Sequence, residues 1–306
     1  MKFYSYACDP TLKDNNGGSL VLKHHLCALT QLGHESGGFL GLGQPVPEDA
    51  DFIMFQSEWY GIIDPLLQRT NAKKICWLGH YFPHKKYSMP DITTIRADFF
   101  HTQYKGEVVE KAKALLNRDI YYLPHAGCNL CNREGQKVPT AMFNTGVNHT
   151  ELQSFPDALI IRNKFNERDE EWLDYAAVEK RNAQFELLNN IYRSTPVIAN
   201  LHGDFQKNIP CDFFPIPGMM MNERIFQVIL AGGFCVTDNN PLTREFFSED
   251  EVPMAMTKEE YREKIMYFVN HQEERLPYMQ KAKQRILDEH LYIHRIIKWT
   301  RSTLKI

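Results

Sequence analysis

The feature that most constrains the fold is a regular alternation of short apolar runs with longer segments of helical length. Each run has the length of a buried strand. The runs cover residues 52–55, 75–78, 92–95 and 120–123 in the first half of the chain, and residues 158–161, 197–200 and 234–237 in the second. Strands that alternate with helices form parallel sheets covered on both faces. The sequence therefore predicts an α/β fold.

The segments between the runs carry helical signals. From Ser19 to Leu32, leucines recur at helical spacing, and Gly33 follows where a helix would end. A strand over residues 2–8 precedes this helix. Further helices are expected at residues 105–116, 169–188, 222–230, 258–270 and 273–288, with a last amphipathic segment at residues 292–304.

The length of 306 residues exceeds what one compact core of average size accommodates, so two domains are expected. Residues 127–155 are rich in Asn, Thr, Gly and Pro and have no clear period, which is typical of a connection between domains. We therefore expect an N-terminal domain of residues 1–145 and a C-terminal domain of residues 146–290. Residues 291–306 are expected to form a helix that packs back on the N-terminal domain.

Charge and cysteine content argue against several classes of protein. Residues 1–140 carry 15 basic and 14 acidic side chains, and residues 141–306 carry 20 and 24, so neither half is basic enough to demand nucleic acid. No apolar stretch has the length of a membrane span, and no signal region follows Met1. The seven cysteines are scattered, as expected for reduced thiols. These observations predict a soluble, cytoplasmic protein.

The first candidate ligand site is Asp14-Asn15-Asn16-Gly17-Gly18-Ser19, between the first strand and the first helix. Its glycines allow a sharp turn that leaves the helix N-terminus open to an anion or a polar ligand. An ordinary turn with a serine cap explains the same residues. The segment is not G-x-G-x-x-G, which disfavours a Rossmann dehydrogenase, and the chain has no G-x-x-x-x-G-K-[ST] phosphate loop.

The second candidate site is the approach to the helix expected from Asn222. Residues 215–221, Pro-Ile-Pro-Gly-Met-Met-Met, form a rigid segment before it. A diphosphate at the start of this helix would meet unpaired backbone N–H groups and the guanidinium of Arg224. A capped surface helix, with Met219–Met221 as core residues, explains the pattern equally well.

A third pattern, His125-x-x-Cys128-x-x-Cys131, contains three potential zinc ligands. The second cysteine pair of a typical zinc site is missing, so free thiols are the preferred interpretation. No metal site is predicted.

The second half of the chain resembles a known family. The motif is Asn222-x-Arg224-x-Phe226-Gln227, followed by Ala231-Gly232-Gly233-Phe234-x-Val236-Thr237-Asp238. It is similar to the C-terminal domain of CgeB-like (spore-protein-related) glycosyltransferases, and the resemblance extends over residues 158–300. Gly17-Gly18, Leu32-Gly33-His34 and residues 123–127 resemble N-terminal domains of GT-B glycosyltransferases. The resemblance implies a GT-B fold, in which two Rossmann-like α/β/α domains face each other across a cleft.

By this resemblance, the C-terminal domain binds the nucleotide sugar and the N-terminal domain presents the acceptor. The implied donor-binding residues are Gly17, Gly18, Arg162, Lys164, Asn200, His202, Gly218, Met221, Asn222, Arg224 and Gln227. Asn222 and Arg224 are expected near the diphosphate, and Arg162 and Lys164 are expected to add positive charge to it. Where related enzymes carry a Glu that accepts hydrogen bonds from the donor ribose, this chain has Gln227, an acceptor without the charge.

The expected donor is a UDP- or GDP-sugar, and no further cofactor is required. His80 and Asp14 are the candidate catalytic residues, since either can act as the base of an inverting reaction. The resemblance to the GT-4-like branch favours retention instead. The acceptor is left open among a glycan, a protein and a metabolite. One alternative is transfer to a modified base in DNA, suggested by the basic segment His80–Lys86, and another is an inactive sugar-nucleotide-binding or structural protein, suggested by Gln227. The oligomeric state is left open.

Overall fold

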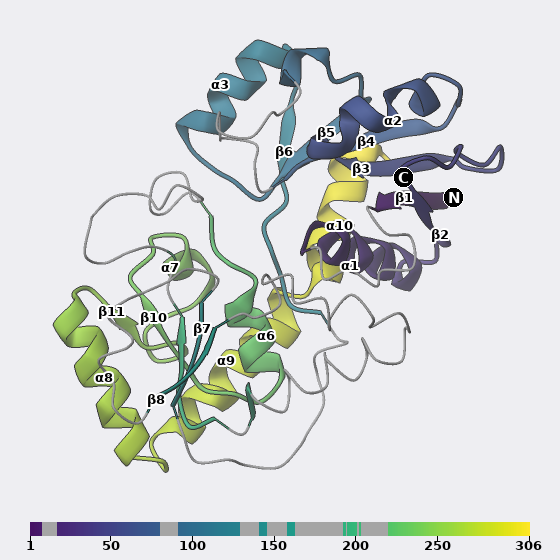
Figure 1. The fold of residues 1–306 in the computed structure, drawn as a ribbon. Helices are drawn as coiled ribbons and strands as arrows, with labels where there is room; N and C mark the ends of the chain where they lie inside the picture. Colours follow the sequence, from purple (N-terminus) through teal and green to yellow (C-terminus); the bar gives the residue numbers. More distant parts are fainter. Residues whose placement is uncertain are drawn as a thin grey trace. The chain divides into compact units, whose positions relative to one another are not determined.

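The computed structural model describes residues 1–7, 17–79, 91–128, 141–145, 158–162, 192–193, 195–200, 202 and 220–306. The chain forms two compact units, one of residues 1–124 with residues 292–306 and one of residues 125–291 (Figure 1). Each unit contains a parallel sheet, so the predicted α/β class is confirmed. No helix in the described ranges has both the length and the apolar character that crossing a membrane requires.

The first unit is built on a six-stranded sheet in the order β2-β1-β3-β4-β5-β6. Its strands are β1 (Lys2–Ala7), β2 (Glu35–Gly41), β3 (Phe52–Gln56), β4 (Lys73–Leu78), β5 (Phe99–Thr102) and β6 (Ile120–Tyr122). Its helices are α1 (Gly17–Gln31), α2 (Tyr60–Leu67), α3 (Glu107–Leu116) and α10 (Tyr292–Trp299), with 3₁₀ turns at Ser57–Trp59 and Ile92–Thr94 and a π-helical end at Thr300–Leu304. Figure 1 shows α1 and α10 on one face of this sheet and α2 and α3 on the other.

Two parts of this unit differ from the sequence prediction. The apolar run at 92–95 begins as a 3₁₀ turn because Asp91 accepts a hydrogen bond from the backbone N–H of Thr93, and the strand follows at β5. β2 has no apolar run that predicts a strand, because its sequence is Glu-Ser-Gly-Gly-Phe-Leu-Gly. Gly37 is required there by packing, since a Cβ would lie 2.2 Å from the Tyr4 ring.

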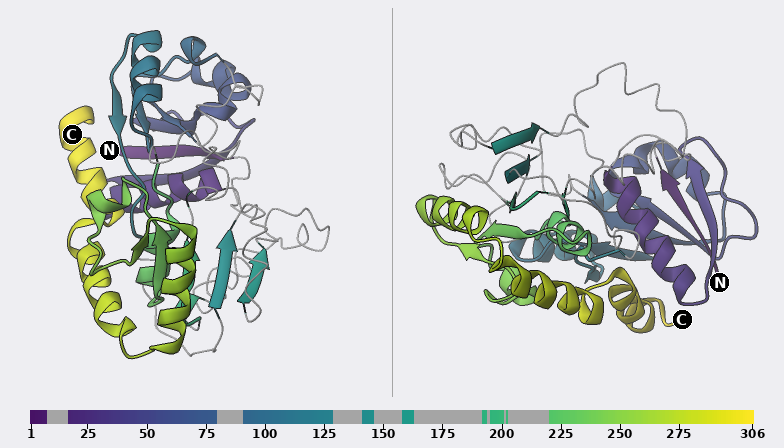
Figure 2. Two further views of the ribbon diagram at one scale, coloured as in Figure 1. Left: turned by 90° about the vertical axis from the view of Figure 1, so that its left-hand side faces the viewer. Right: turned by 90° about the horizontal axis from the view of Figure 1, so that it is seen from below.

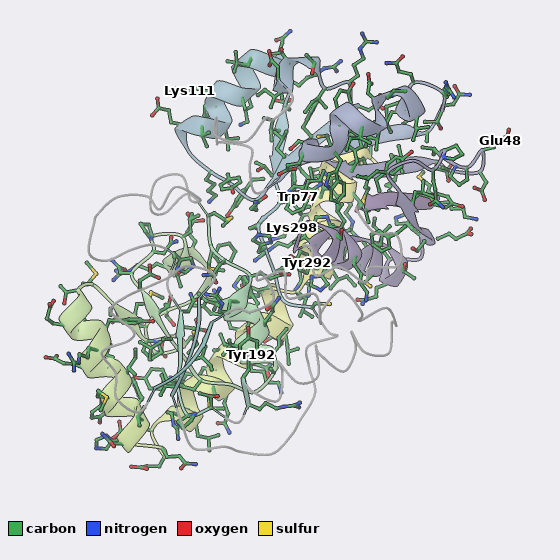
Figure 3. All side chains as sticks on the ribbon, in the orientation of Figure 1. Glu48, Trp77, Lys111, Tyr192, Tyr292 and Lys298 are labelled. Atoms are coloured by element: carbon green, nitrogen blue, oxygen red, sulfur yellow. The ribbon has the colours of Figure 1, made fainter. Side chains whose placement is uncertain are left out.

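The C-terminal helix α10 packs on α1 within the first unit, and two views show the pair side by side (Figures 1 and 2). Tyr292, Ile296 and Trp299 are buried and share one face of α10, because they are four and seven residues apart. The ring of Tyr292 lies 5.4 Å from that of His25, and the ring of Trp299 lies 5.1 Å from that of His101. Charged side chains such as Glu48 and Lys111 project outward instead (Figure 3).

The second unit contains a five-stranded parallel sheet in the order β11-β10-β9-β7-β8. Its strands are β7 (Ala141–Thr145), β8 (Ala158–Arg162), β9 (Ile198–Asn200), β10 (Cys235–Asp238) and β11 (Met254–Ala255), and its helices are α6 (Arg224–Leu230), α7 (Thr243–Phe246), α8 (Lys258–Asn270) and α9 (Arg275–Glu289). The helix expected at residues 169–188 lies outside the described residues. β7 pairs with β8 and β9, so residues 141–145 belong to this unit and the expected boundary at 145 moves to 124.

The two faces of this sheet carry different side chains. One face packs on α8 through a buried apolar cluster of Val197, Ala199, Phe234, Val236, Ala255, Tyr261, Ile265 and Phe268. Successive residues of a strand point to opposite faces. Asn200 and Thr237 follow Ala199 and Val236 directly, so their polar side chains point away from α8. This alternation brings polar groups to the ends of β9 and β10.

His101 predicts an acid-sensitive component of the stability of the first unit. The side chain is fully buried, its ring nitrogens have no hydrogen-bond partner among the described residues, and burial lowers its pKa from 6.5 to about 3. Below pH 6.5 the unfolded chain therefore binds a proton that the folded chain excludes. From there down to a pH of about 3, the contribution of this group to stability should fall by roughly 1 kcal/mol per pH unit.

Replacing this imidazole should flatten the acid side of the stability curve. Between pH 6.5 and about 4.5, the melting temperature of His101→Leu should fall less steeply than that of the wild type in scanning calorimetry. The matched control is His271→Leu, because His271 is only half-buried and its hydrogen bond to Tyr267 O is exposed, so this variant should keep the wild-type slope. Equal slopes for wild type and His101→Leu would contradict the assignment.

Candidate functional site

The candidate site lies where β9 and β10 end. The two strands are parallel, and Asn200, the last residue of β9, is directly beside Thr237 of β10. From β7 the sheet grows to one side through β8 and to the other through β9, β10 and β11, so the strand order reverses between β7 and β9. Doubly wound sheets bind ligands outside the carboxyl ends of their strands at such a reversal.

The side chain of Asn200 is the centre of a buried polar network. Its Oδ1 accepts hydrogen bonds from Asn222 Nδ2 at 2.9 Å and from Arg224 Nη1 at 3.1 Å. Its Nδ2 donates to Thr237 Oγ1 at 3.0 Å, and its backbone oxygen accepts from the hydroxyl of Tyr261 at 3.2 Å. Asn200 is fully buried, so these contacts replace water around its polar atoms. One amide therefore joins two strands to the residues that lead into α6.

Asn222 does not cap the following helix. α6 begins at Arg224, and the preceding Glu223 has helical backbone angles and no side-chain capping bond. The expected helix start at residue 222 is therefore corrected by two residues, and the amide of Asn222 is used to contact β9. The capped-helix explanation of this asparagine does not fit the structure.

α6 is fixed by its apolar face. Ile225, Phe226, Val228, Ile229 and Leu230 are buried. The ring of Phe226 lies 6.1 Å from that of Phe246, 5.6 Å from that of Phe247 and 6.4 Å from that of His290. This packing holds the helix in place independently of its polar first residue.

Arg224 carries the positive charge of the site. The side chain is half-buried, and among the described residues it makes one hydrogen bond, to Asn200, and no ion pair. A guanidinium has five N–H donors in a planar fork that matches a phosphate or carboxylate. Burial raises the pKa of the Cys235 thiol to about 12, and the positive charge of Arg224 acts on this pKa in the opposite direction. The arrangement can therefore bind an anion at the carboxyl edge of the sheet.

The network continues from Thr237 to a histidine–aspartate pair. Thr237 donates to Asp238 Oδ1 at 3.2 Å, and the same oxygen contacts His202 Nδ1 at 2.6 Å. The backbone N–H of His202 donates to Asp238 Oδ2 at 3.0 Å. The side chains of His202 and Asp238 are 5% and 15% exposed. Hydrogen bonds thus connect Arg224 to His202 through Asn200, Thr237 and Asp238.

Sequence reasoning missed the role of Thr237 and Asp238. Both residues stand at the end of the family-like pattern, but no role follows from that pattern alone. Their contacts arise from the register that places Thr237 beside Asn200. The signal for these roles in the sequence is that Thr237 and Asp238 are two polar residues at the end of an apolar strand.

The structure brings together Asn200, His202, Asn222 and Arg224 among the predicted site residues. The other predicted residues belong to the elements named next or lie outside the described ranges. Gly17 and Gly18 begin α1 in the first unit, Arg162 ends β8, Met221 is buried just before α6, and Gln227 is half-buried on α6. His80, Asp14, Lys164 and Gly218 lie outside the residues that the structure describes.

The Ala231-Gly232-Gly233 turn is explained by packing. It follows the last residue of α6, so it lies at the end of the helix opposite Arg224. Gly232 has a φ of +83°, which favours glycine, and a Cβ on Gly233 would lie 2.6 Å from the backbone oxygen of Tyr192. Backbone conformation and packing therefore account for both glycines of this turn.

The pattern of His125, Cys128 and Cys131 falls only partly within the described structure. His125 and Cys128 are buried in the second unit, and Cys131 lies outside the described residues. No group of three potential metal ligands occurs among the residues described.

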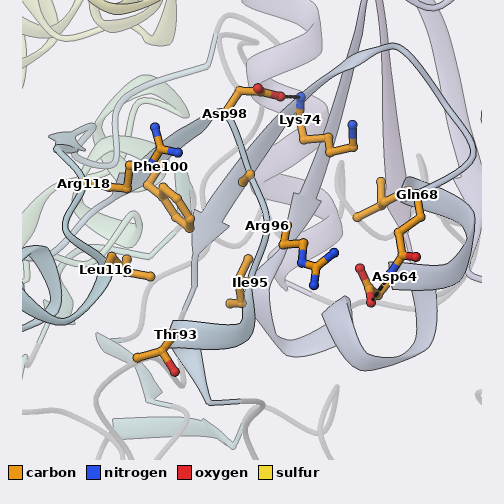
Figure 4. Close-up of a pocket in the computed structure, with 12 residues that line it drawn as sticks. Asp64, Gln68, Lys74, Thr93, Ile95, Arg96, Asp98, Phe100, Leu116 and Arg118 are labelled. Carbon is orange, nitrogen blue, oxygen red and sulfur yellow. Dashed lines mark hydrogen bonds between the residues drawn. The ribbon is translucent and has the colours of Figure 1, made fainter.

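The first unit has a pocket of about 630 Å³ whose lining includes none of these predicted residues (Figure 4). It is lined by Asp64, Leu67, Gln68, Lys74, Thr93, Ile95, Arg96, Ala97, Asp98, Phe100, Leu116 and Arg118. It lies where β4 and β5 begin and α2 and α3 end, which is the edge of the sheet opposite to the one that binds ligands in doubly wound folds. Its charges are mixed, and helix C-termini disfavour anions. The pocket is therefore a poor site for a diphosphate.

The second half of the chain matches a known family model. Residues 154–301 match the family model described as "Glycosyl transferase-like". A search of curated proteins finds no significant sequence match.

Solved structures of low sequence identity share the fold. A sucrose-phosphate synthase from Thermosynechococcus elongatus is 8% identical with a TM-score of 0.57, over 100% of this chain and 98% of that one. Anabaena HepE in complex with UDP is 11% identical with a TM-score of 0.54, over 99% of each chain. T4 phage BGT in complex with UDP and Mn²⁺ is 10% identical with a TM-score of 0.51, over 99% and 96% of the two chains. The chain has the predicted GT-B fold, with a Rossmann-like sheet in each unit.

The Asn200 network predicts a specific loss of stability in the second unit. Asn200→Ala removes the partner of Thr237, Asn222 and Arg224, so the free energy of unfolding should fall by about 1–3 kcal/mol. Urea denaturation measures this loss. Asn270→Ala is the matched control, because the Asn270 side chain is exposed, bonds only to Met266 O among the described residues, and should change stability by less than about 0.5 kcal/mol. Equal effects of the two variants would contradict the proposed importance of the network.

Proposed function

We propose that this protein is a glycosyltransferase that transfers a sugar from a nucleotide-sugar donor to an acceptor. The observation that carries the proposal is the guanidinium of Arg224, half-buried and without an ion pair among the described residues, at the carboxyl edge of a parallel sheet. The glycosyl transferase-like match covers residues 154–301 and therefore includes the whole network around Asn200. Charge, sheet topology and family match all favour the same site.

The donor is proposed to be a UDP-sugar, with a GDP-sugar as the second choice. Anabaena HepE and T4 phage BGT, which share the fold, were both solved with UDP. Glycosyl transfer from such a donor leaves negative charge on the diphosphate, and a fixed cation lowers the energy of that state. Arg224 supplies the cation, and Asn200 fixes its direction through one hydrogen bond. In this scheme the protein itself provides charge stabilisation, without a required metal.

The acceptor side is assigned by resemblance to the first unit. Gly17 and Gly18, which begin α1 in that unit, remain candidate donor contacts. His80 and Asp14 remain candidate catalytic residues, Arg162 and Lys164 remain candidate sources of additional charge near the donor, and Gly218 and Met221 remain candidate backbone contacts.

We propose a CgeB-like enzyme with a retaining outcome, on the resemblance of its C-terminal half. A cytoplasmic location is proposed from the thiols of Cys76 and Cys235, which form no disulfide among the described residues.

Removal of the guanidinium tests the proposed donor site. Arg224→Ala should reduce sugar transfer by a factor of 100 or more, on the order of what loss of a charge-stabilising contact costs, while the far-UV circular dichroism stays unchanged. Transfer is measured as release of UDP from a UDP-sugar in the presence of a mixture of glycan, peptide and small-molecule acceptors. Arg244→Ala is the control, because Arg244 is an exposed arginine of α7 that contacts Asn239.

Two outcomes would count against the proposal. Wild-type turnover in Arg224→Ala would exclude Arg224 from the donor site. No donor hydrolysis and no transfer by the wild type, despite binding of the nucleotide, would favour an inactive nucleotide-sugar-binding protein, the alternative suggested by Gln227.

A further inference from the structure

We infer that His202 and Asp238 form a recognition pair in which Asp238 positions the imidazole so that Nε2 accepts a hydrogen bond from an N–H or O–H group of the donor. The inference rests on the proposed function and deepens it, because it names a specificity-determining contact of the same site. It depends on the contacts of His202, its burial and its connection to Arg224.

The contacts of Asp238 fix the tautomer of His202. An ionised carboxylate only accepts hydrogen bonds, so Nδ1, which lies 2.6 Å from Asp238 Oδ1, carries the ring proton. In the neutral imidazole the other nitrogen, Nε2, is then an acceptor. The second carboxylate oxygen binds the backbone N–H of the same residue at 3.0 Å, which holds the whole residue against Asp238. Asp238 therefore sets both the position and the hydrogen-bonding character of the ring.

Nε2 has no partner in the described structure although it is shielded from water. The side chain of His202 is 5% exposed, and this nitrogen is among the buried polar atoms without a hydrogen bond. A buried polar atom left unsatisfied is costly, and such atoms are rare in folded proteins. A ligand group that donates to Nε2 removes this cost. The ring is thus prepared to accept one hydrogen bond that the described residues do not supply.

The position of the ring points to the donor as the source of that hydrogen bond. His202 follows β9 at the strand-order reversal, and hydrogen bonds connect it to Arg224 through Asn200, Thr237 and Asp238. An ionised diphosphate has no N–H or O–H group to donate. The contact is therefore with the base, the ribose or the transferred sugar.

His202→Asn separates recognition from a purely structural role. The asparagine amide can still donate to Asp238 in the place of Nδ1, but it has no atom in the place of Nε2. The variant should keep the wild-type melting temperature without ligand and lose affinity for the donor by about tenfold, as expected for one hydrogen bond to a buried group. His271→Asn is the matched control, because His271 is a half-buried histidine of the same unit whose Nδ1 contacts a backbone oxygen, that of Tyr267.

Asp238→Asn tests whether Asp238 determines which nitrogen of the His202 ring donates and which accepts a hydrogen bond. The backbone N–H of His202 requires an acceptor at the Oδ2 position, so the new amide places its oxygen there and its NH₂ group towards Nδ1. Nδ1 then accepts, the proton moves to Nε2, and the ring becomes a donor on the ligand side. A variant that only loses packing or stability would not change Nε2 from a hydrogen-bond acceptor to a donor.

The experiment is calorimetric titration of the full chain and its variants with UDP, CDP and UDP-glucose. If the ring contacts the base, His202→Asn weakens UDP about tenfold and CDP little, because N3 of uracil donates and N3 of cytosine accepts. Asp238→Asn then shifts the preference from UDP towards CDP. If the ring contacts the ribose, His202→Asn weakens all three ligands, and if it contacts the transferred sugar, it weakens UDP-glucose alone. Each of these three patterns supports the inference.

Unchanged affinities of His202→Asn for all three ligands would overturn the inference while leaving the proposed function intact. Should this variant unfold, His202→Gln replaces it, since its amide oxygen reaches towards the place of Nε2 and should retain more affinity than His202→Ala. Equal affinities of those two variants would also overturn the inference. Failure of the wild type to bind any of the ligands, or GDP-glucose added as a fourth, would instead contradict the proposed function itself.

Discussion

The site depends on one buried amide. The short side chain of Asn200 has both a hydrogen-bond donor and a hydrogen-bond acceptor. Its Oδ1 accepts hydrogen bonds from Asn222 and Arg224, and its Nδ2 donates to Thr237. A carboxylate in its place would lack the donor, and an apolar side chain would lack both groups. Because Asn200 is fully buried, each bond is made away from water and each missing bond is expensive. The direction of the Arg224 guanidinium is therefore coupled to the pairing of β9 with β10.

The parts of α6, the helix that carries Arg224, have different roles: most of the helix packs on other residues, and its first residue carries the charge of the site. Its apolar residues pack on aromatic rings. Its far end turns at Gly232, whose φ is +83°, and at Gly233, where the backbone oxygen of Tyr192 leaves no room for a side chain. At its near end the guanidinium contacts a neutral amide and no described carboxylate. The packing stabilises the helix without neutralising its charge, which leaves Arg224 available to an anion.

The alternation of strands and helices could be predicted because the apolar residues of most strands are contiguous in the sequence. The prediction failed where local pattern and tertiary structure disagree. β2 contains Gly37, which lies against the Tyr4 ring, and β5 contains His101, whose burial depends on the packing of α10. The residues around Asn222 and Arg224 could be selected by resemblance. The part played by Asp238 could not, because its contact with His202 exists only once β9 and β10 are aligned.

The central claim is that the nucleotide binds at the carboxyl ends of β9 and β10, beside the first turn of α6. Hydrogen–deuterium exchange of the full chain, measured by mass spectrometry with and without UDP, locates the binding site without a substitution. The account predicts slower exchange in peptides covering residues 198–202, 222–230 and 235–240 when UDP is bound. Binding of UDP with protection confined to other parts of the chain would contradict it.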